Sequence, residues 1–402
     1  MANNYVFNDS LPVAPLKVAA LESIEPFARK VNDHIVDFRR NDTQELIRRK
    51  ADLHYRGYDV DSYLLKCQCP RFGSGEAKAV IHESVRGADI FAMVDVTNYS
   101  LTYKVSGNVN HMSPDDHYQD LKRLIGACAT TAHRVNVIMP FLYESRQHKR
   151  TKRESLDCAM ALQELVSMGV SNIITFDAHD PRVQNAIPLH GFDNFMPTYQ
   201  FVKALFRHDK DLQIDKDHLM IISPDEGAMN RAVYLANNLG VDMGMFYKRR
   251  DYSRVVNGRN PIVAHEFLGT SVEGKTVLII DDMIASGESM LDTAKELRER
   301  KAAKVIVCCT FGLFTGGLEK FDEFYEKGYI DYVITTNLNY RPEELFNREW
   351  YVEADMSKYL AAIINSLNHD VPIGSALSPT EKIQTLIQNY HADGYDYYQV
   401  IR

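Results

Sequence analysis

The fold is decided by the stretch Thr276–Leu291, TVLIIDDMIASGESML. It opens with an apolar, β-branched run, continues through Asp281 and Asp282, and then passes through small and hydroxylated residues into a segment with helical spacing. This order predicts a strand, a tight turn and a helix, the unit from which sheets of mostly parallel strands are built.

Similar units flank this stretch on both sides. The expected strands fall into two sets, Asp89–Val94, Val135–Pro140 and Asn172–Phe176, then Leu219–Ile222, Gly244–Tyr247, Thr276–Ile280, Lys304–Cys309 and Tyr332–Thr335. The expected helices are Asp157–Met168, ended by Gly169, and Ala228–Asn238, Ser289–Arg300 and Leu318–Lys327. At about 150 residues per domain, 402 residues allow two or three domains. We predict an α/β protein with two tandem α/β domains.

The flanking segments are expected to be additions to this core. We expect a helical N-terminal extension over residues 1–52, a first domain over 53–200, a second over 201–340, and a C-terminal helical segment over 341–402. That last segment holds an amphipathic helix near Met356–Leu367. Val96–Ser113 is rich in Asn, Ser and Thr and is expected to form a long loop.

Composition narrows the class of protein. The chain is 45% apolar and 25% charged, as globular proteins are, and its net charge of −8 argues against a surface built for nucleic acid. It contains no apolar run of about 18 residues and does not open like a secretory signal. The six cysteines lack the density or spacing of a disulfide or zinc framework. We expect free thiols, no membrane partner and a cytoplasmic location.

The deciding stretch also carries chemistry. Carboxylates at a strand end, here Asp281 and Asp282, can accept hydrogen bonds from sugar hydroxyls. Small residues at a helix N-terminus, here Ser286 to Ser289, leave backbone N–H groups free to bind a phosphate. The acids and the helix N-terminus together suit a sugar phosphate. The alternative is an ordinary strand-to-helix turn with Ser289 as N-cap.

This stretch resembles the ribose 5-phosphate loop of type I phosphoribosyltransferases, in which four apolar residues precede two acids and a short Ser/Thr/Gly turn. Further segments, from about Arg71 to Asn337, resemble the ribose-phosphate pyrophosphokinase family, whose members join two such domains and make phosphoribosyl pyrophosphate from ATP and ribose 5-phosphate. The resemblance implies a type I phosphoribosyltransferase fold in both domains. It assigns ribose 5-phosphate binding to Asp281, Asp282, Ser286, Gly287, Glu288 and Ser289.

A second segment, Pro140–Arg153, PFLYESRQHKRTKR, places five cations within eight residues. Such a loop can close over a triphosphate, whereas a solvated charge run or a nucleic-acid patch would have the same composition. Its Arg146-Gln147 pair resembles the ATP-binding arginine and glutamine of the pyrophosphokinases. The resemblance therefore assigns ATP binding to Arg146 and Gln147.

A third segment, RFGSGE at Arg71–Glu76, is followed by ESVRG and resembles a pair of segments near the start of the same family. The resemblance implies that Phe72 and Glu76 reach the adenine from a neighbouring subunit. It therefore implies a homo-oligomer, a dimer or a hexamer, with a shared ATP site. The alternative for Phe72 is a core aromatic residue.

Two turns at strand ends carry candidate metal ligands. A lone histidine such as His179, in Asp177–Asp180, is ordinarily a structural hydrogen bonder because Mg²⁺ prefers oxygen ligands. In the resembled family a histidine in such a turn helps to hold the Mg²⁺ of MgATP, with the aspartate of a Ser-Pro-Asp-x-Gly turn, here Asp225. The resemblance therefore implies Mg²⁺ as cofactor, held by His179 and Asp225.

A further strand end carries Lys248 and Arg250. Residues two apart in an extended segment face the same side, so the two cations can converge on one anion, although a solvated sheet edge would also carry them. Fixed cations that neutralise developing charge are the means by which proteins catalyse phosphoryl transfer. The family's catalytic Lys-x-Arg corresponds to Lys248 and Arg250.

The prediction is therefore an enzyme with ATP and ribose 5-phosphate as partners, which transfers the diphosphoryl group of ATP to the C1 hydroxyl of the sugar and releases AMP. One alternative is a phosphoribosyltransferase acting on a base. Another is a catalytically weak, nucleotide-binding homologue that regulates a true synthetase. Ser74, Ala285 and Glu288 favour that reading because the first two replace acids that are usual in the family.

Overall fold

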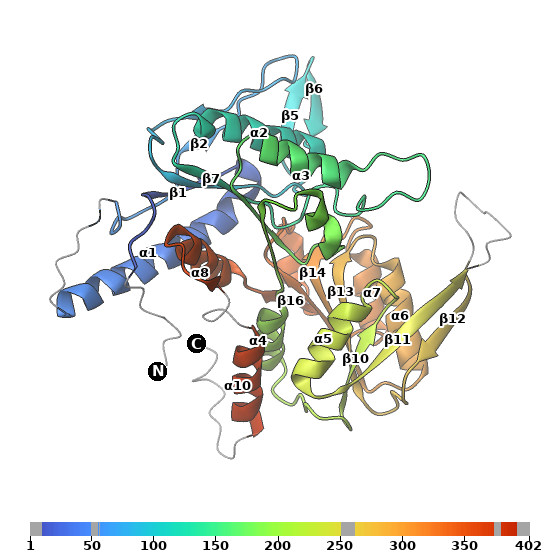
Figure 1. The fold of residues 1–402 in the computed structure, drawn as a ribbon. Helices are drawn as coiled ribbons and strands as arrows, with labels where there is room; N and C mark the ends of the chain where they lie inside the picture. The colour runs from blue at the N-terminus through green and yellow to red at the C-terminus, as the bar shows by residue number, and fades with distance from the viewer. Residues whose placement is uncertain (1–9, 50–54, 56, 251–261, 374–378, 392–402) are drawn as a thin grey trace.

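A computed structural model describes residues 10–49, 55, 57–250, 262–373 and 379–391; of Lys248–Arg250, Ile262–His265 and Tyr390–His391 only the backbone is described. The chain folds into two α/β domains, one above the other in Figure 1. Both domains are built on sheets of mostly parallel strands, as the sequence predicts.

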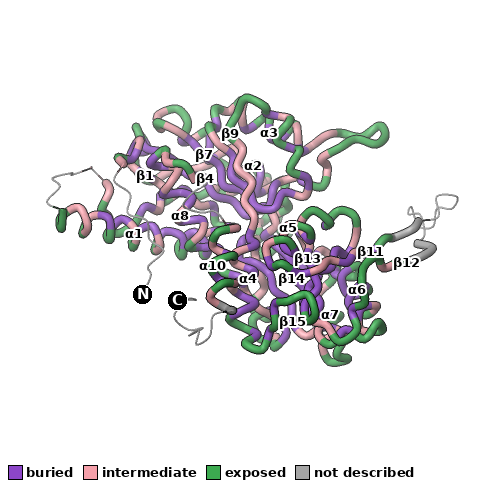
Figure 2. The backbone as a smooth tube through the Cα atoms, turned by 60° about the horizontal axis from the view of Figure 1, so that its bottom comes forward, coloured by how far each residue is buried: buried purple, intermediate pink, exposed green. Residues whose placement is uncertain are grey.

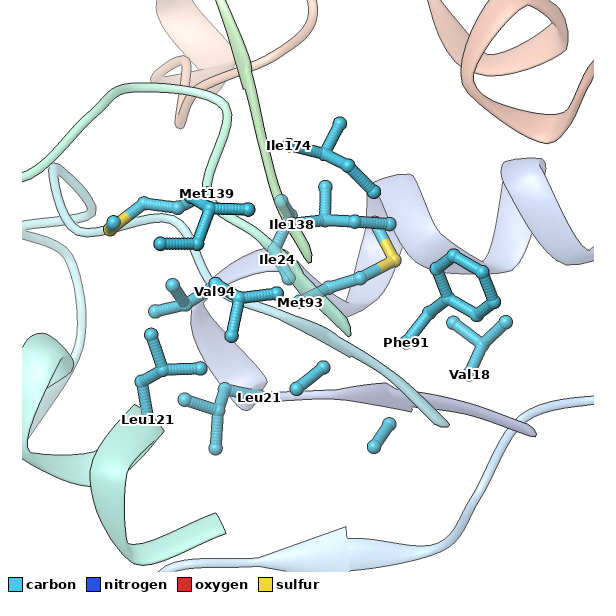
Figure 3. Close-up of a cluster of buried hydrophobic side chains, with 14 of the residues drawn as sticks. Val18, Leu21, Ile24, Phe91, Met93, Val94, Leu121, Ile138, Met139 and Ile174 are labelled. Carbon is cyan, nitrogen blue, oxygen red and sulfur yellow. The ribbon is translucent and has the colours of Figure 1, made fainter. Parts of the chain in front are cut away.

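The first domain contains a five-stranded sheet in which all neighbours are parallel. Its strands, in spatial order, are β1 (Leu16–Ala20), β4 (Asp89–Met93), β7 (Arg134–Ile138), β8 (Asn172–Phe176) and β9 (Gly191–Phe195). Apolar side chains from several of these strands meet on the sheet, as Figure 3 shows for Val18, Phe91, Ile138 and Ile174. Burying such runs on both faces is what a parallel sheet requires.

The second domain contains a seven-stranded sheet, parallel except at one edge. Its order is β12 (Ile262–Leu268), β11 (Asp242–Arg250), β10 (Leu219–Ser223), β13 (Thr276–Ile284), β14 (Lys304–Gly312), β15 (Tyr332–Thr336) and β16 (Tyr351–Ala354). The β11–β12 pair is antiparallel and projects from the body of the domain (Figure 1). Figure 2 shows the central strands of this sheet buried.

Helices cover both sheets. They are α1 (Glu25–Arg48), α2 (Pro114–Ala129), α3 (Asp157–Ser167), α4 (Thr198–His208), α5 (Met229–Leu239), α6 (Glu288–Glu299), α7 (Glu319–Glu326), α8 (Ser357–Asn368) and α10 (Pro379–His391), with short 3₁₀ turns η1 (Glu22–Ile24), η2 (Pro181–Ala186) and η3 (Glu343–Asn347). The four predicted helices α3, α5, α6 and α7 lie within one residue of their expected bounds. Gly169 ends α3 with a positive φ of 86°, as expected.

The N-terminal segment contains the predicted helix, α1, but it begins with a strand and is part of the first domain rather than an extension of it. Residues Leu16–Ala20 form β1, which pairs in parallel with β4, and α1 follows directly. The run LKVAALES consists largely of good helix formers, so local propensity favours a helix here. Pairing with β4 outweighs that preference, because it buries Leu16 and Val18 in the core of the first domain.

The C-terminal segment is also part of the core. β16 adds the last strand to the second sheet, whereas α8 packs against α1 and places Leu360, Ile363 and Ile364 in the core of the first domain. The predicted amphipathic helix is therefore present, but its apolar face closes the domain that begins at the other end of the chain.

The expected loop over Val96–Ser113 contains a β-hairpin, β5 (Thr102–Val105) and β6 (Asn108–His111). Its turn residues Ser106 and Gly107 both have positive φ, 50° and 83°, as a two-residue hairpin turn requires. A smaller pair, β2 (Cys67–Gln68) and β3 (Val80–Ile81), precedes it. All six cysteines are free thiols, and Cys308 and Cys309 are buried in β14. In the described part of the chain, no helix is both long and apolar enough to cross a bilayer.

Candidate active site

The candidate site lies where the two domains meet. His179, in the turn after β8 of the first domain, places Nδ1 2.7 Å from Oδ2 of Asp282 in β13 of the second. The contact joins residues 103 positions apart. It brings the predicted metal-binding turn onto the predicted sugar-binding acids, and both lie at the carboxyl ends of parallel strands, where α/β proteins bind ligands.

β13 is longer than the sequence suggests. β10 pairs with it only to Ile279, whereas β14 pairs with it to Ile284, so the strand continues through Asp281 and Asp282. The two acids therefore lie within a strand that has a neighbour on one side only. Successive strand residues face opposite sides, and Asp282 is accordingly buried while Asp281 is partly exposed.

The two adjacent carboxyl groups have unlike electrostatics. Burial, and then the nearby charges of Asp282 and Asp225, raise the pKa of Asp281 well above its usual value. Although burial opposes it, the pKa of Asp282 is lowered, by hydrogen bonding to His179 and by the charge of Arg231. Pairs of acids driven in opposite directions are typical of active sites.

The turn after Asp282 forms the start of α6. Gly287 has a φ of 82°, and a Cβ atom there would lie 2.5 Å from the ring of Phe321, so this position requires glycine. The helix begins at Glu288, with Gly287 rather than Ser289 as N-cap, and Ser286 and Ser289 are exposed. Exposed hydroxyls and the first N–H groups of a twelve-residue helix form a surface suited to a phosphate.

The second predicted metal ligand, Asp225, lies in the turn between β10 and α5. Its Oδ1 accepts hydrogen bonds from the N–H groups of Gly227, at 2.9 Å, and Ala228, at 3.3 Å. Its charge contributes to the raised pKa of Asp281. Asp225 therefore belongs to the same group of acids. Within the described residues, no three His, Cys, Asp or Glu side chains form a metal site by themselves.

The cationic loop contacts the His179 turn. His148 lies with its ring 5.4 Å from that of His179 and Nε2 3.5 Å from Oδ2 of Asp180. Nε2 of Gln147 donates to the carbonyl of Ser155 at 2.6 Å and closes the base of the loop, while Arg146 is exposed. The contact made by His148 has no signal in the sequence, because it depends on how the loop folds back over the turn.

The segment with Phe72 and Glu76 forms a tight turn, with the N–H of Phe72 donating to the carbonyl of Glu76 at 2.7 Å. Arg71 anchors it through an ion pair with Asp120 at 2.8 Å. Ser74 donates to Glu76 at 2.8 Å. The side chain of Phe72 is 52% exposed, so in the single chain it is not a core aromatic residue.

Lys248 and Arg250 lie in β11, which runs to Arg250 and pairs with β12. Lys248 is opposite His265 and Arg250 opposite Ile262, with a register irregularity between Arg249 and Arg250. Their side chains lie outside the described part of the structure, so their assignment stays a prediction.

Comparison with family models gives two adjacent matches. A model of the N-terminal domain of ribose phosphate pyrophosphokinase matches residues 16–169, and a model of the phosphoribosyl transferase domain matches residues 202–341. The chain belongs to the ribose-phosphate pyrophosphokinase family. The first match begins at β1, in agreement with the finding that β1 and α1 are part of the first domain.

Curated members of the ribose-phosphate pyrophosphokinase family align over most of the chain. The ribose-phosphate pyrophosphokinase of Staphylococcus epidermidis is 27% identical over 340 residues, 84% of this chain and 88% of the relative. That of Staphylococcus aureus is 28% identical over 275 residues, which are 68% of this chain and 77% of the relative. The crystal structure of phosphoribosylpyrophosphate synthetase from Mycobacterium smegmatis superimposes with a TM-score of 0.66 at 21% identity, covering 88% of this chain and 99% of that one. The superposition supports the tandem fold.

The family motifs do not identify every residue at the centre of the site. Arg231 and Asp177 lie inside recognised motifs, but the sequence gives them no role, and Thr310 has no signal at all. All three are buried or nearly so: Arg231 lies 3.7 Å from Asp282, and both Arg231 and Thr310 bond Asp177. Only the folded chain brings them together.

Proposed function

We propose that this chain is a ribose-phosphate diphosphokinase. In the proposed reaction the C1 hydroxyl oxygen of ribose 5-phosphate forms a bond to the β-phosphorus of ATP, the bond from that phosphorus to the α,β-bridging oxygen breaks, and AMP leaves with that oxygen. The hydroxyl proton is lost to the surroundings. The observation that carries the proposal is the contact between His179 and Asp282, because it joins a nucleotide-domain turn to a sugar-phosphate loop.

The sugar phosphate is assigned to the second domain. Exposed Ser286 and Ser289 and the N-terminus of α6 would bind the 5-phosphate, with Gly287 giving the close turn and Glu288 at the first helical position. Asp281 would accept hydrogen bonds from the ribose hydroxyls. Asp282 already bonds His179, so its contribution to the sugar is shared with that role.

ATP is assigned to the first domain. Arg146 on the exposed cationic loop would bind the triphosphate, and Gln147 would hold the loop closed at its base. The exposed Phe72, and Glu76 in the same turn, would contact the adenine of a neighbouring subunit in a homo-oligomer. Lys248 and Arg250 would neutralise the diphosphoryl group as charge develops on it.

A magnesium ion fits the donors present. When bound with ATP, Mg²⁺ would neutralise phosphate oxygens during transfer. It is usually held by one or two carboxylates and by the substrate phosphates, and Asp225 offers such a carboxylate. Asp282 occupies Nδ1 of His179 and leaves Nε2 for the ion, an arrangement common around metal-binding histidines.

The proposal is tested by mixing the protein with MgATP and ribose 5-phosphate and measuring AMP. Parent protein should release AMP only when the sugar phosphate is present. Lys248→Ala should lower turnover by several orders of magnitude and change ATP affinity by less than about tenfold, because the cation acts in the transition state. No AMP from protein that binds both ligands would support the regulatory homologue, and AMP release by Lys248→Ala at the parent rate would remove that residue's role.

The shared ATP site has its own test. Phe72→Ala and Lys248→Ala subunits each keep the part that the other lacks, so co-refolding the two inactive variants should restore some AMP production. Each variant refolded alone is the control. Hetero-assembly without recovered activity would mean that Phe72 acts within its own subunit.

A further inference from the structure

A buried polar chain crosses from one domain to the other beside the site. Asp177, at the end of β8, uses both carboxylate oxygens for partners in the second domain: Oδ1 accepts from Nε of Arg231 and Oδ2 from Oγ1 of Thr310, each at 2.6 Å. Asp177 is 4% exposed and Thr310 is fully buried. The two hydrogen bonds therefore join β8 to α5 and to β14 at once.

Asp177 is held in an unusual backbone conformation. Its φ of 40° lies in the left-handed region, which residues other than glycine seldom adopt. Its N–H donates to the carbonyl of Phe195 at 2.9 Å, which fixes this turn against β9. A strained residue persists only where its surroundings hold it, and such residues cluster at functional sites.

Arg231 extends the chain to the site. Its Nη2 lies 3.7 Å from Oδ2 of Asp282, the same oxygen to which Nδ1 of His179 is bonded at 2.7 Å. The contacts thus run from Thr310 through Asp177 and Arg231 to Asp282 and His179. The contacts that cross the domain boundary here include those of Asp177 with Arg231 and Thr310, and that of His179 with Asp282.

We infer that Asp177, Arg231 and Thr310 form an interdomain clasp that positions the carboxylate of Asp282 and, through it, the ring of His179. The inference rests on the proposed function for its kinetic consequence. The clasp residues act through other residues, so they are positioning residues. Stability alone does not explain them, because a buried ion pair is on average no better for stability than apolar groups of the same shape.

The clasp fixes one tautomer of His179. An ionised carboxylate has only acceptors, so Nδ1 must carry the proton in its contact with Asp282 and Nε2 must be unprotonated whenever the imidazole is neutral. Within the described residues Nε2 has no hydrogen-bond partner. A change that lets Asp282 turn would release this constraint without touching His179.

The kinetic test uses one substitution at two places. Thr310→Val removes the clasp hydroxyl, whereas Thr175→Val makes the same change at an equally buried threonine whose hydroxyl bonds the carbonyl of Pro140 inside the first domain. We expect Thr310→Val to lower kcat about tenfold, the lower end of the loss that follows removal of a direct outer partner of a metal-binding histidine, because Thr310 acts on His179 through Asp177, Arg231 and Asp282; KM for ribose 5-phosphate should stay within about twofold. Thr175→Val should keep the parent kcat, and Thr310→Ser should restore most of it. Equal kcat in Thr310→Val and Thr175→Val would overturn the inference.

A second readout does not depend on activity. The nitrogen-15 NMR signals of His179, identified by their loss in His179→Gln, should show the tautomer protonated on Nδ1 in the nucleotide-free parent protein. Arg231→Met should give a mixture of tautomers in a chain that still unfolds cooperatively. An unchanged tautomer in Arg231→Met would overturn the inference, and an inactive parent with the expected tautomer change would instead refute the proposed function while keeping the clasp.

Discussion

Two buried networks of arginine and aspartate hold distant parts of this chain together, and they differ in kind. In the first domain, Arg134 binds Asp89 through two hydrogen bonds of 2.9 and 2.7 Å. Asn136 and Asn368 donate to the same carboxylate, each at 2.9 Å, so that α8 is tied to β4 and β7. Both oxygens of Asp89 are occupied by donors of the chain itself.

The second network consists of the clasp together with Asp282 and His179. It ends at a partly exposed side chain, whereas in the Asp89 network both carboxylate oxygens are occupied. Asp281 and Asp282 are adjacent acids whose pKa values are shifted in opposite directions, and the side chain of His179 at its end is 35% exposed. Asp177 is strained as well. Both networks are buried and paired, so these properties do not separate the structural Asp89 network from the functional network around the clasp. The functional network is distinguished by adjacent acids with opposite pKa shifts, by backbone strain and by a partly exposed histidine.

The largest expected effect distinguishes Asp282, whose loss should affect activity, from Asp89, whose loss should affect stability. Asp282→Ala should lower the rate of AMP formation by about 10²–10³, as loss of one preorganised electrostatic group does, in a protein that still folds. Asp89→Ala should instead leave little folded protein, because the buried amides of Asn136 and Asn368 would lose their acceptor and Arg134 would keep only Asp370 as an ion-pair partner. Thermal unfolding with activity per folded molecule distinguishes the two. Equal loss of activity and of stability in both variants would contradict the distinction between a structural and a functional network.

The next effect is on stability alone. Arg134→Met should lower the free energy of unfolding by about 3–5 kcal/mol, since it leaves the carboxylate of Asp89 buried and unpaired. Denaturant unfolding measures this loss. The kcat per folded molecule should stay at the parent value, and a tenfold drop in kcat would place Arg134 in the functional network.

A smaller effect has the opposite sign. Asp281→Asn should raise stability at neutral pH by about 1–2 kcal/mol, as relief of active-site strain does elsewhere, and weaken ribose 5-phosphate binding. The folded pKa of Asp281 is raised, so its charged form costs stability above the unfolded pKa of about 3.9. The advantage of the asparagine variant should therefore vanish as the pH falls below about 4. A variant less stable than the parent at pH 7 would contradict the raised pKa.

The smallest effect concerns His369, which follows Asn368 of the Asp89 network in the chain. Burial lowers the pKa of His369 from 6.5 to about 4, and its Nδ1 lies 2.6 Å from the carbonyl of Asn365. Because the unfolded chain binds this proton more readily, parent protein should lose about 1 kcal/mol of stability as the pH falls from about 6.5 to about 5.5. His369→Gln should flatten that slope in unfolding curves measured between pH 7 and 5. Parallel slopes in parent and variant would show that another group is responsible.

The local sequence predicts the individual strands, turns and helices of this molecule, but not the contacts between segments that are far apart in the chain. The strand, acids and turn of TVLIIDDMIASGESML are all local, and the structure reproduces them with a longer strand. The bond from His179 to Asp282 and the return of α8 to the first domain depend on packing between segments far apart in the chain. β1 shows the same limit, because its helix-forming residues become a strand only when β4 is beside them.

The central claim is transfer of an intact diphosphoryl group at the junction of the two domains. ATP labelled with phosphorus-32 at the β position, incubated with ribose 5-phosphate, Mg²⁺ and parent protein, tests it most directly. We expect the label to move into phosphoribosyl pyrophosphate while unlabelled AMP forms in equal amount, and we expect Asp282→Ala to make little of either. Label recovered in ADP, or remaining in ATP with fully folded parent protein, would contradict it.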